Sequence, residues 1–193
     1  MGVQVVTAPT EEPVSLAEAK LHLRVVDNDE DALITGLIAA ARGSIEKLLG
    51  RALVTQTWRI TLKEFPQFPT WVRYNCIELP GGPAQSVETI KYTDTNGDEQ
   101  ELADYDEDLS GSIGIVAPVF GQGWPMVRRG LAGVRIEYVV GFGAASEVPE
   151  AIKAAIKLTI GELYANREIS VDAKLSENPA IDSLLWAYRM VSL

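Results

Sequence analysis

Apolar residues near both ends of the chain recur at the spacing of α-helices. The segment Ser15-Leu16-Ala17-Glu18 has the form of a capping box, which predicts a short helix from Ser15 to about Arg24. Helical spacing predicts a second helix over 30–49, and it returns over 149–166. Each long helix carries one wide apolar stripe, and a lone amphipathic helix is marginal in water. We therefore expect these two helices to pack together.

The period of the pattern changes to two residues in the middle of the chain. Alternation from Val54 to Leu62 and again from Val134 to Phe142 predicts two half-buried strands. Another strand is expected over 71–79, and Asn96-Gly97 predicts a hairpin turn between strands at 86–93 and 99–105. The β-rich region of the sequence thus lies between the helical segments.

This order of helices, strands and helix predicts an α+β fold rather than an alternating α/β fold. We expect a helical bundle built from the N- and C-terminal segments, with an inserted antiparallel β-rich region. The predicted division is an N-terminal helical segment over 1–52, a β-rich region over 53–147 and a C-terminal helical segment over 148–193. The first and last segments would form one helical domain.

Composition and charge narrow the possible functions. The 193 residues include 27 acidic and 17 basic side chains, a net charge of −10, and no cluster of Lys and Arg of the kind that binds phosphate backbones. The single cysteine, Cys76, cannot form an internal disulfide, which fits a reducing cytoplasm. We expect no membrane segment, because no stretch approaches the ~20 apolar residues of a membrane span.

Candidate chemistry is sparse. His22 is the only histidine, and neither it nor Cys76 has the partners of a nucleophilic or zinc site. Asp94, Asn96 and Asp98 match the first ligand positions of a calcium loop, but Glu99 stands where that loop requires glycine. We therefore favour a solvated hairpin there. The sequence predicts no enzyme activity, no cofactor and no metal.

Four segments together resemble a known family. They are Ser15–Lys20, the strand end Val139–Gly143 with Val148–Lys153, Leu163–Glu168 and Leu184–Arg189. Their order and spacing resemble the head-tail connector (adaptor) proteins of tailed bacteriophages and prophages. The β-rich middle, although least alike in sequence, is similar to the longer members, in which strands are inserted between the helices.

The resemblance implies a structural virion protein in the neck between head and tail, made in the cytoplasm of the bacterial host. It implies a homo-oligomeric ring of about a dozen copies, closed by heterologous contacts. Its partners would be the capsid portal protein and a stopper or tail protein. DNA would pass through without specific binding, and an acidic surface suits that passage because like charges repel.

An alternative hypothesis is a stand-alone binding module whose β-region captures a carbohydrate or a peptide. Trp58, Trp71 and Trp124 would then be stacking residues, although core or interface positions suit aromatic residues better. The mass in solution would discriminate between the two hypotheses.

The C-terminal segment 181–193 is too apolar for a free tail and is our candidate interaction site. At helical spacing, Ile181 falls on one face with three other residues, whereas Trp186 points elsewhere. One face could complete the core of the subunit and the other could bind a partner, and the resemblance suggests the portal. The candidate partner-binding residues are Leu184, Leu185, Trp186, Tyr188 and Arg189.

Overall fold

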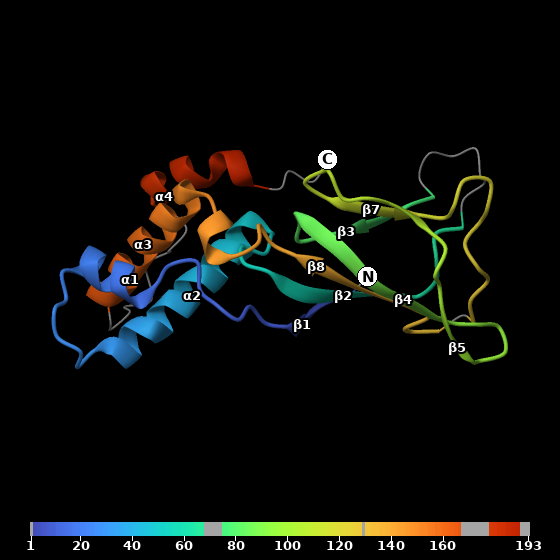
Figure 1. Ribbon diagram of the computed structural model, residues 1–193, viewed down its shortest axis with the longest axis horizontal. Helices are drawn as coiled ribbons and strands as arrows, with labels where there is room; N and C mark the ends of the chain where they lie inside the picture. Colours follow the sequence, from blue (N-terminus) through green and yellow to red (C-terminus); the bar gives the residue numbers. More distant parts are fainter. Residues whose placement is uncertain (1, 68–74, 129, 167–177, 190–193) are drawn as a thin grey trace. The chain divides into compact units, whose positions relative to one another are not determined.

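The computed structural model describes residues 2–67, 75–128, 130–166 and 178–189. Its backbone contacts divide the chain into two compact units. Residues 1–9 and 55–141 form one unit, here named the β unit, and residues 10–54 and 142–193 form the other, the helical unit. Helices together with antiparallel sheets confirm the predicted α+β class (Figure 1).

The helical unit contains the three helices predicted from the sequence and a helix in the C-terminal segment, which the sequence analysis treated at helical spacing. Their bounds are α1 (Leu16–Leu23), α2 (Asp31–Leu49), α3 (Glu150–Ala165) and α4 (Pro179–Leu185), with short 3-10 turns η1 (Ala145–Glu147) and η3 (Trp186–Tyr188). The predicted capping box begins α1: the Ser15 hydroxyl accepts from the Glu18 N–H, and the Glu18 carboxylate accepts from the Ser15 N–H at 2.8 Å. Gly50, at φ 70°, ends α2 in the left-handed conformation that glycine adopts at low cost.

The predicted packing of the two long helices is confirmed. α3 contacts α2 and also α4, so it connects the other helices of this unit (Figure 1). Their apolar stripes interlock in one core, in which Ile38 of α2 and Ile156 of α3 are almost completely buried. Fully burying an isoleucine side chain contributes roughly 1.5–3 kcal/mol, which explains why helices about a hundred residues apart pair.

The β unit contains two antiparallel sheets. The larger sheet has the strand order β1-β2-β8-β4-β5, and the smaller one has the order β3-β7-β6. The larger sheet comprises β1 (Gly2–Thr7), β2 (Gln56–Leu62), β4 (Ala84–Thr93), β5 (Glu99–Glu101) and β8 (Val134–Val140). The smaller sheet comprises β3 (Ile77–Leu79), β6 (Asp106–Asp108) and β7 (Gly114–Ala117).

The predicted alternation along the central strands is present. In β8, every second residue from Val134 to Val140 is buried and the residues between them are half-buried. In the register of the sheet, Ile60 of β2 and Ile90 of β4 lie on either side of Ile136, so three isoleucines meet on one face. The predicted hairpin at Asn96-Gly97 connects β4 to β5.

Aromatic side chains hold the β unit together on this apolar face. Phe65 stacks on Trp124 with ring centroids 4.7 Å apart, and it meets the edge of Tyr92. The Tyr138 hydroxyl donates to the Pro80 carbonyl at 2.9 Å, which ties the chain after β3 to the larger sheet. Burial raises the pKa of Tyr138 well above its usual range, so the hydroxyl keeps this proton.

β1 is one of the strands that the sequence did not indicate, together with β6 and β7. β1 pairs with β2, so the first nine residues belong to the β unit, whereas the sequence grouped them with the N-terminal helical segment that ends at Ala52. The chain therefore passes between the units three times, after Pro9, after Val54 and after Gly141. Among the described helices, none has the length and hydropathy needed to cross a membrane.

Candidate functional site

The candidate interaction segment forms α4 and the turn η3. The Asn178 side chain accepts from the Ala180 N–H at 3.0 Å, and Pro179 occupies the first turn, where its missing N–H costs nothing. Ile181 and Leu185, one helical turn apart, are buried in the core of the helical unit. These two side chains dock the segment.

The candidate residues fall on two sides of this segment. Leu184 and Tyr188 are partly buried and pack against the same core as Leu185. Trp186 points away from that core, and 76% of its surface is exposed. This geometry matches the division of faces that the spacing predicted.

Arg189 forms an ion pair with a residue of α4. Its Nη2 lies 2.7 Å from Oδ1 of Asp182, seven residues earlier. Its Nε is buried and has no hydrogen-bond partner within the described part of the chain. Sequence spacing could not indicate this pair, because the helix ends between the two residues. Met190, Val191 and Leu193 lie outside the described residues.

The Asp94 loop has the geometry of a turn rather than of a metal site. Asp94 Oδ1 accepts from the N–H groups of Asn96, Gly97 and Asp98 at 2.9–3.0 Å. These hydrogen bonds lower the pKa of the Asp94 carboxyl, and the bond from the Asp98 N–H has the largest effect. The oxygen that a cation would need is thus directed to backbone donors.

The other candidate groups show no shared chemistry. His22 lies on the exposed side of α1, as expected for a surface residue, and Cys76 is a half-buried free thiol. Among the described residues, no three His, Cys, Asp or Glu side chains come together as a metal site.

The tryptophans give little support to a stacking platform. Trp124 is buried against Phe65, and its Nε1 donates to the Asn75 carbonyl at 3.1 Å, so it belongs to the core. Trp58 is half-buried, and its Nε1 donates to Gln56. Trp71 lies outside the described residues.

A groove of about 460 Å³ lies in the helical unit, lined by Pro13, Leu16, Ile38 and neighbouring polar residues. Two of its carboxylates already have partners. Glu11 accepts from the Ala145 N–H at 2.8 Å, and Glu12 forms an ion pair with Arg42 at 2.7 Å. The groove therefore serves as a seam between segments of this unit, and these glutamates are engaged in holding that seam together.

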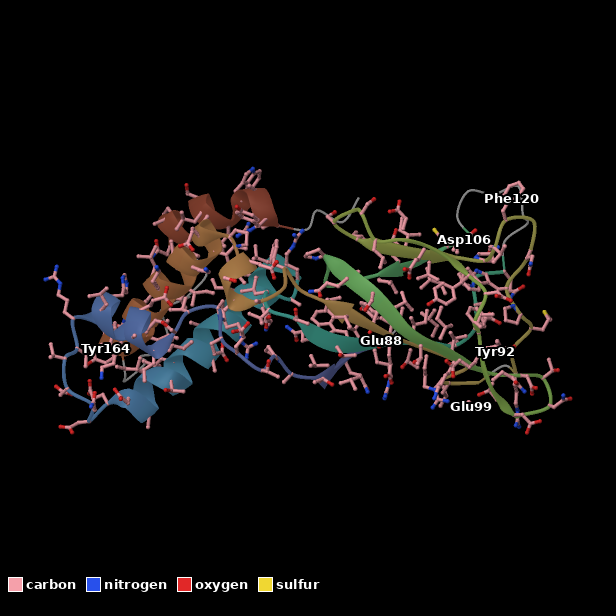
Figure 2. All side chains as sticks on the ribbon, in the orientation of Figure 1. Glu88, Tyr92, Glu99, Asp106, Phe120 and Tyr164 are labelled. Carbon is pink, nitrogen blue, oxygen red and sulfur yellow. The ribbon has the colours of Figure 1, made fainter. Side chains whose placement is uncertain are left out.

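Several exposed apolar side chains were not indicated by the sequence. Phe120 extends from the β7–β8 connection, and its N–H donates to Asp106 (Figure 2). Val26 and Leu131 are each more than nine-tenths exposed and, like Phe120, lie outside the helices and strands. Periodicity assigns faces only within helices and strands, so it gives no signal for side chains at turns and loop tips.

The chain matches a protein-family model described as phage gp6-like head-tail connector protein. It covers residues 13–115, which is more than half of the chain. The chain belongs to this family. The resemblance inferred from the four sequence segments is thereby confirmed. No protein of curated function shows significant similarity to this connector.

Solved structures show the same fold. The connector matches a chain in the neck of the empty gene transfer agent (GTA) particle, computed with C6 symmetry, with a TM-score of 0.79 and 22% identity. It matches a chain in the virion of the native GTA particle with a TM-score of 0.79 and 23% identity. It also matches a chain in the neck of the native particle, computed with C12 symmetry, with a TM-score of 0.75 and 24% identity. Each match covers 100% of this chain and 97% of the other.

Proposed function

We propose that this connector forms a ring of about a dozen copies in the neck of a phage-like virion. The ring would join the portal to a stopper or tail protein. The observation that carries the proposal is the family match over residues 13–115. The shared fold with neck chains of particles computed with C6 and C12 symmetry supports it.

In this proposal, the N- and C-terminal helices act as one bundle that carries the β-rich region as an insertion. The helices would make the contacts with the portal. The protein would be made in the cytoplasm of the bacterial host and retained in the virion. DNA would pass through the ring, and the net charge of −10 would keep it from adhering to the wall.

The portal contact is assigned to the exposed side of the C-terminal segment. Trp186 and Arg189 are of the types that most often dominate binding energy, and they are the first residue of η3 and the residue that follows its end. Leu184, Leu185 and Tyr188 would hold the segment on its own subunit and thereby orient Trp186.

Two measurements test this proposal. Negative-stain images of the purified protein, alone and mixed with the portal protein, should show rings that dock on the portal. Trp186→Ala should weaken portal binding by at least about tenfold, because truncated anchor residues cost roughly 2 kcal/mol or more. Its thermal unfolding should stay unchanged, because the side chain is largely exposed.

The matched control is Phe120→Ala, which removes another exposed aromatic side chain, from the β unit. It should leave portal binding unchanged. Equal losses for both variants would contradict the assignment of the contact to Trp186. A monomer at all concentrations, with or without portal, would contradict the ring. A point substitution is preferable to truncation after Pro179, because truncation removes the buried Ile181 and Leu185.

A further inference from the structure

The outer edge of β1 is unusual among the strand edges of this chain. β1 is paired on one side only, with β2, and all six of its residues are exposed. It carries no charge, and Val3, Val5 and Val6 expose 45%, 53% and 41% of their surfaces. Long, uncharged edge strands are normally avoided, because their free N–H and C=O groups invite another strand.

The other edges of the β unit are protected in the usual ways. β5 and β6 are only three residues long, and five of their six side chains are acidic. β4 has two register shifts against β8, which distort its backbone. β3 also has only three residues. Over Gly2 to Val5, β1 is thus the one strand, among those described, whose edge has neither charge nor a register shift, and its own shift lies beyond this stretch, between Val5 and Thr7.

The chain after β1 is firmly held on the helical unit. Val14 is fully buried there, and Glu12 pairs with Arg42. Only residues 8–10 lie between the end of β1 and Glu11, whose side chain accepts from Ala145. Pro9 stands at the centre of this connection and restricts its backbone. Short, stiff hinges of this kind favour the exchange of a terminal element between copies.

We propose that, in the assembled ring, β1 of each copy leaves its own sheet and pairs with β2 of the next copy. This inference rests on the ring proposed above. Exchange preserves every β1–β2 contact, including the register pairs Val3–Ile60 and Val5–Trp58, so it costs little beyond repositioning the hinge. Each copy then donates one strand and receives one, which is the heterologous contact that cyclic symmetry requires.

The occupant of the β2 edge is a second copy because the sequence of β1 already complements that edge. A strand from another protein would have to reproduce this pairing with a different sequence, whereas β1 of the next copy makes it with the same residues. Direct pairing of β1 with β1 of another copy would be symmetric and would stop at two copies. Exchange in one direction around the ring avoids that limit.

A disulfide between copies tests the exchange. Thr7 and Thr57 are register partners, and directly opposite residues of antiparallel strands have Cβ atoms close enough for a disulfide. In a Cys76→Ser background, one preparation carries Thr7→Cys and another carries Thr57→Cys. Neither can cross-link within its own β1–β2 pair. The two are mixed, assembled and mildly oxidised.

Exchange predicts that this mixture forms disulfide-linked dimers at about tenfold the yield of a control mixture, because pairing raises the local thiol concentration. The control combines Thr7→Cys with Thr95→Cys, an exposed turn position that is not in register with β1. A yield equal to that of the control would overturn the exchange.

A single chain carrying both Thr7→Cys and Thr57→Cys gives the direction of exchange. Exchange around a ring predicts a ladder of linked chains on a non-reducing gel. Bands that stop at two chains would show reciprocal exchange, and single-chain bands would show that β1 stays on its own β2; either result overturns the inference. Images of the same samples distinguish failure of the exchange from failure of the ring. Rings together with single-chain bands would overturn the exchange alone. A ladder of linked chains without rings would overturn the ring alone. If the samples show no rings and no ladder, both the ring and the exchange are overturned.

Discussion

At the scale of single residues, the carboxylate of Asp94 organises the turn between β4 and β5. It accepts three successive backbone N–H groups, and Oδ2 accepts from the Gln100 side chain at 3.2 Å. Gly97 completes the turn at φ 102°, a conformation that other residues adopt only with strain. One side chain therefore sets the geometry of the whole hairpin.

This arrangement predicts a pH dependence of the hairpin. The pKa of Asp94 is lowered in the folded protein, so the ionised carboxylate stabilises the hairpin above the unfolded value of about 3.9. That stabilisation is lost as the pH falls through the lower, folded pKa. A side-chain NMR titration of Asp94 should give a midpoint below about 3.9.

Asp94→Asn is the matched variant, because it keeps an acceptor oxygen and loses the titration. Protection of the Gly97 amide against exchange, measured relative to its intrinsic exchange rate at each pH, should fall at low pH in the parent protein, and this dependence should be weaker in the variant. A midpoint of Asp94 at or above the unfolded value would contradict the role of these hydrogen bonds.

At the scale of elements, the contact between α2 and α3 should dominate the stability of the helical unit. Ile38→Asp and Ile156→Asp each place a charge without a counterion in an apolar core. We expect each to lower the free energy of unfolding by roughly 3–5 kcal/mol. Denaturant unfolding followed by far-ultraviolet circular dichroism measures the change.

Ala40→Asp provides the control on the exposed side of α2. This substitution should lower the free energy of unfolding by less than about 1 kcal/mol, because it changes the helix propensity without burying a charge. If the core variants unfolded at the same denaturant concentration as this control, the α2–α3 interface would not carry the stability of the unit.

Elements were predictable where their signals are local. The capping box at Ser15 and the Asn96-Gly97 turn each depend on a few adjacent residues, and periodicity located the long helices and central strands. β1 was missed because its apolar residues do not alternate strictly with polar ones and because its partner β2 begins about fifty residues later. In the small sheet, β3 pairs with the distant β7, whereas β6 and β7 pair locally. A strand of three or four residues is too short to show a period.

The candidate site was predictable to the same extent. Helical spacing separated Leu185 from Trp186, and the structure buries the first and exposes the second. The ion pair between Asp182 and Arg189 was not predictable, since it depends on how the chain turns after α4. The role of these residues in portal binding stays a prediction.

At the scale of the whole molecule, an acidic surface should prevent adhesion to DNA. With a net charge of −10, the protein at about 10 µM should leave the mobility of duplex DNA unchanged at physiological salt, where basic proteins bind non-specifically with Kd values of roughly 10⁻⁴–10⁻⁶ M. An electrophoretic mobility assay measures this.

A charge-reversed variant shows whether acidity is the cause. Replacing the exposed Asp106, Glu107 and Asp108 of β6 by lysine changes the side-chain charge at each position from negative to positive. Binding of DNA by this variant alone would support electrostatic exclusion. Retardation of DNA by the parent protein would contradict the proposed passage through the ring.

The triple passage of the chain between the two units has a mechanical consequence. After Pro9, Val54 and Gly141 the backbone leaves one unit and enters the other, so three covalent connections run in parallel. A pull that separates the units is divided among three backbones, and a single proteolytic cut at any one crossing leaves two intact. A protein built in this way would tolerate a nick, or a pull on one unit, without losing either of its units.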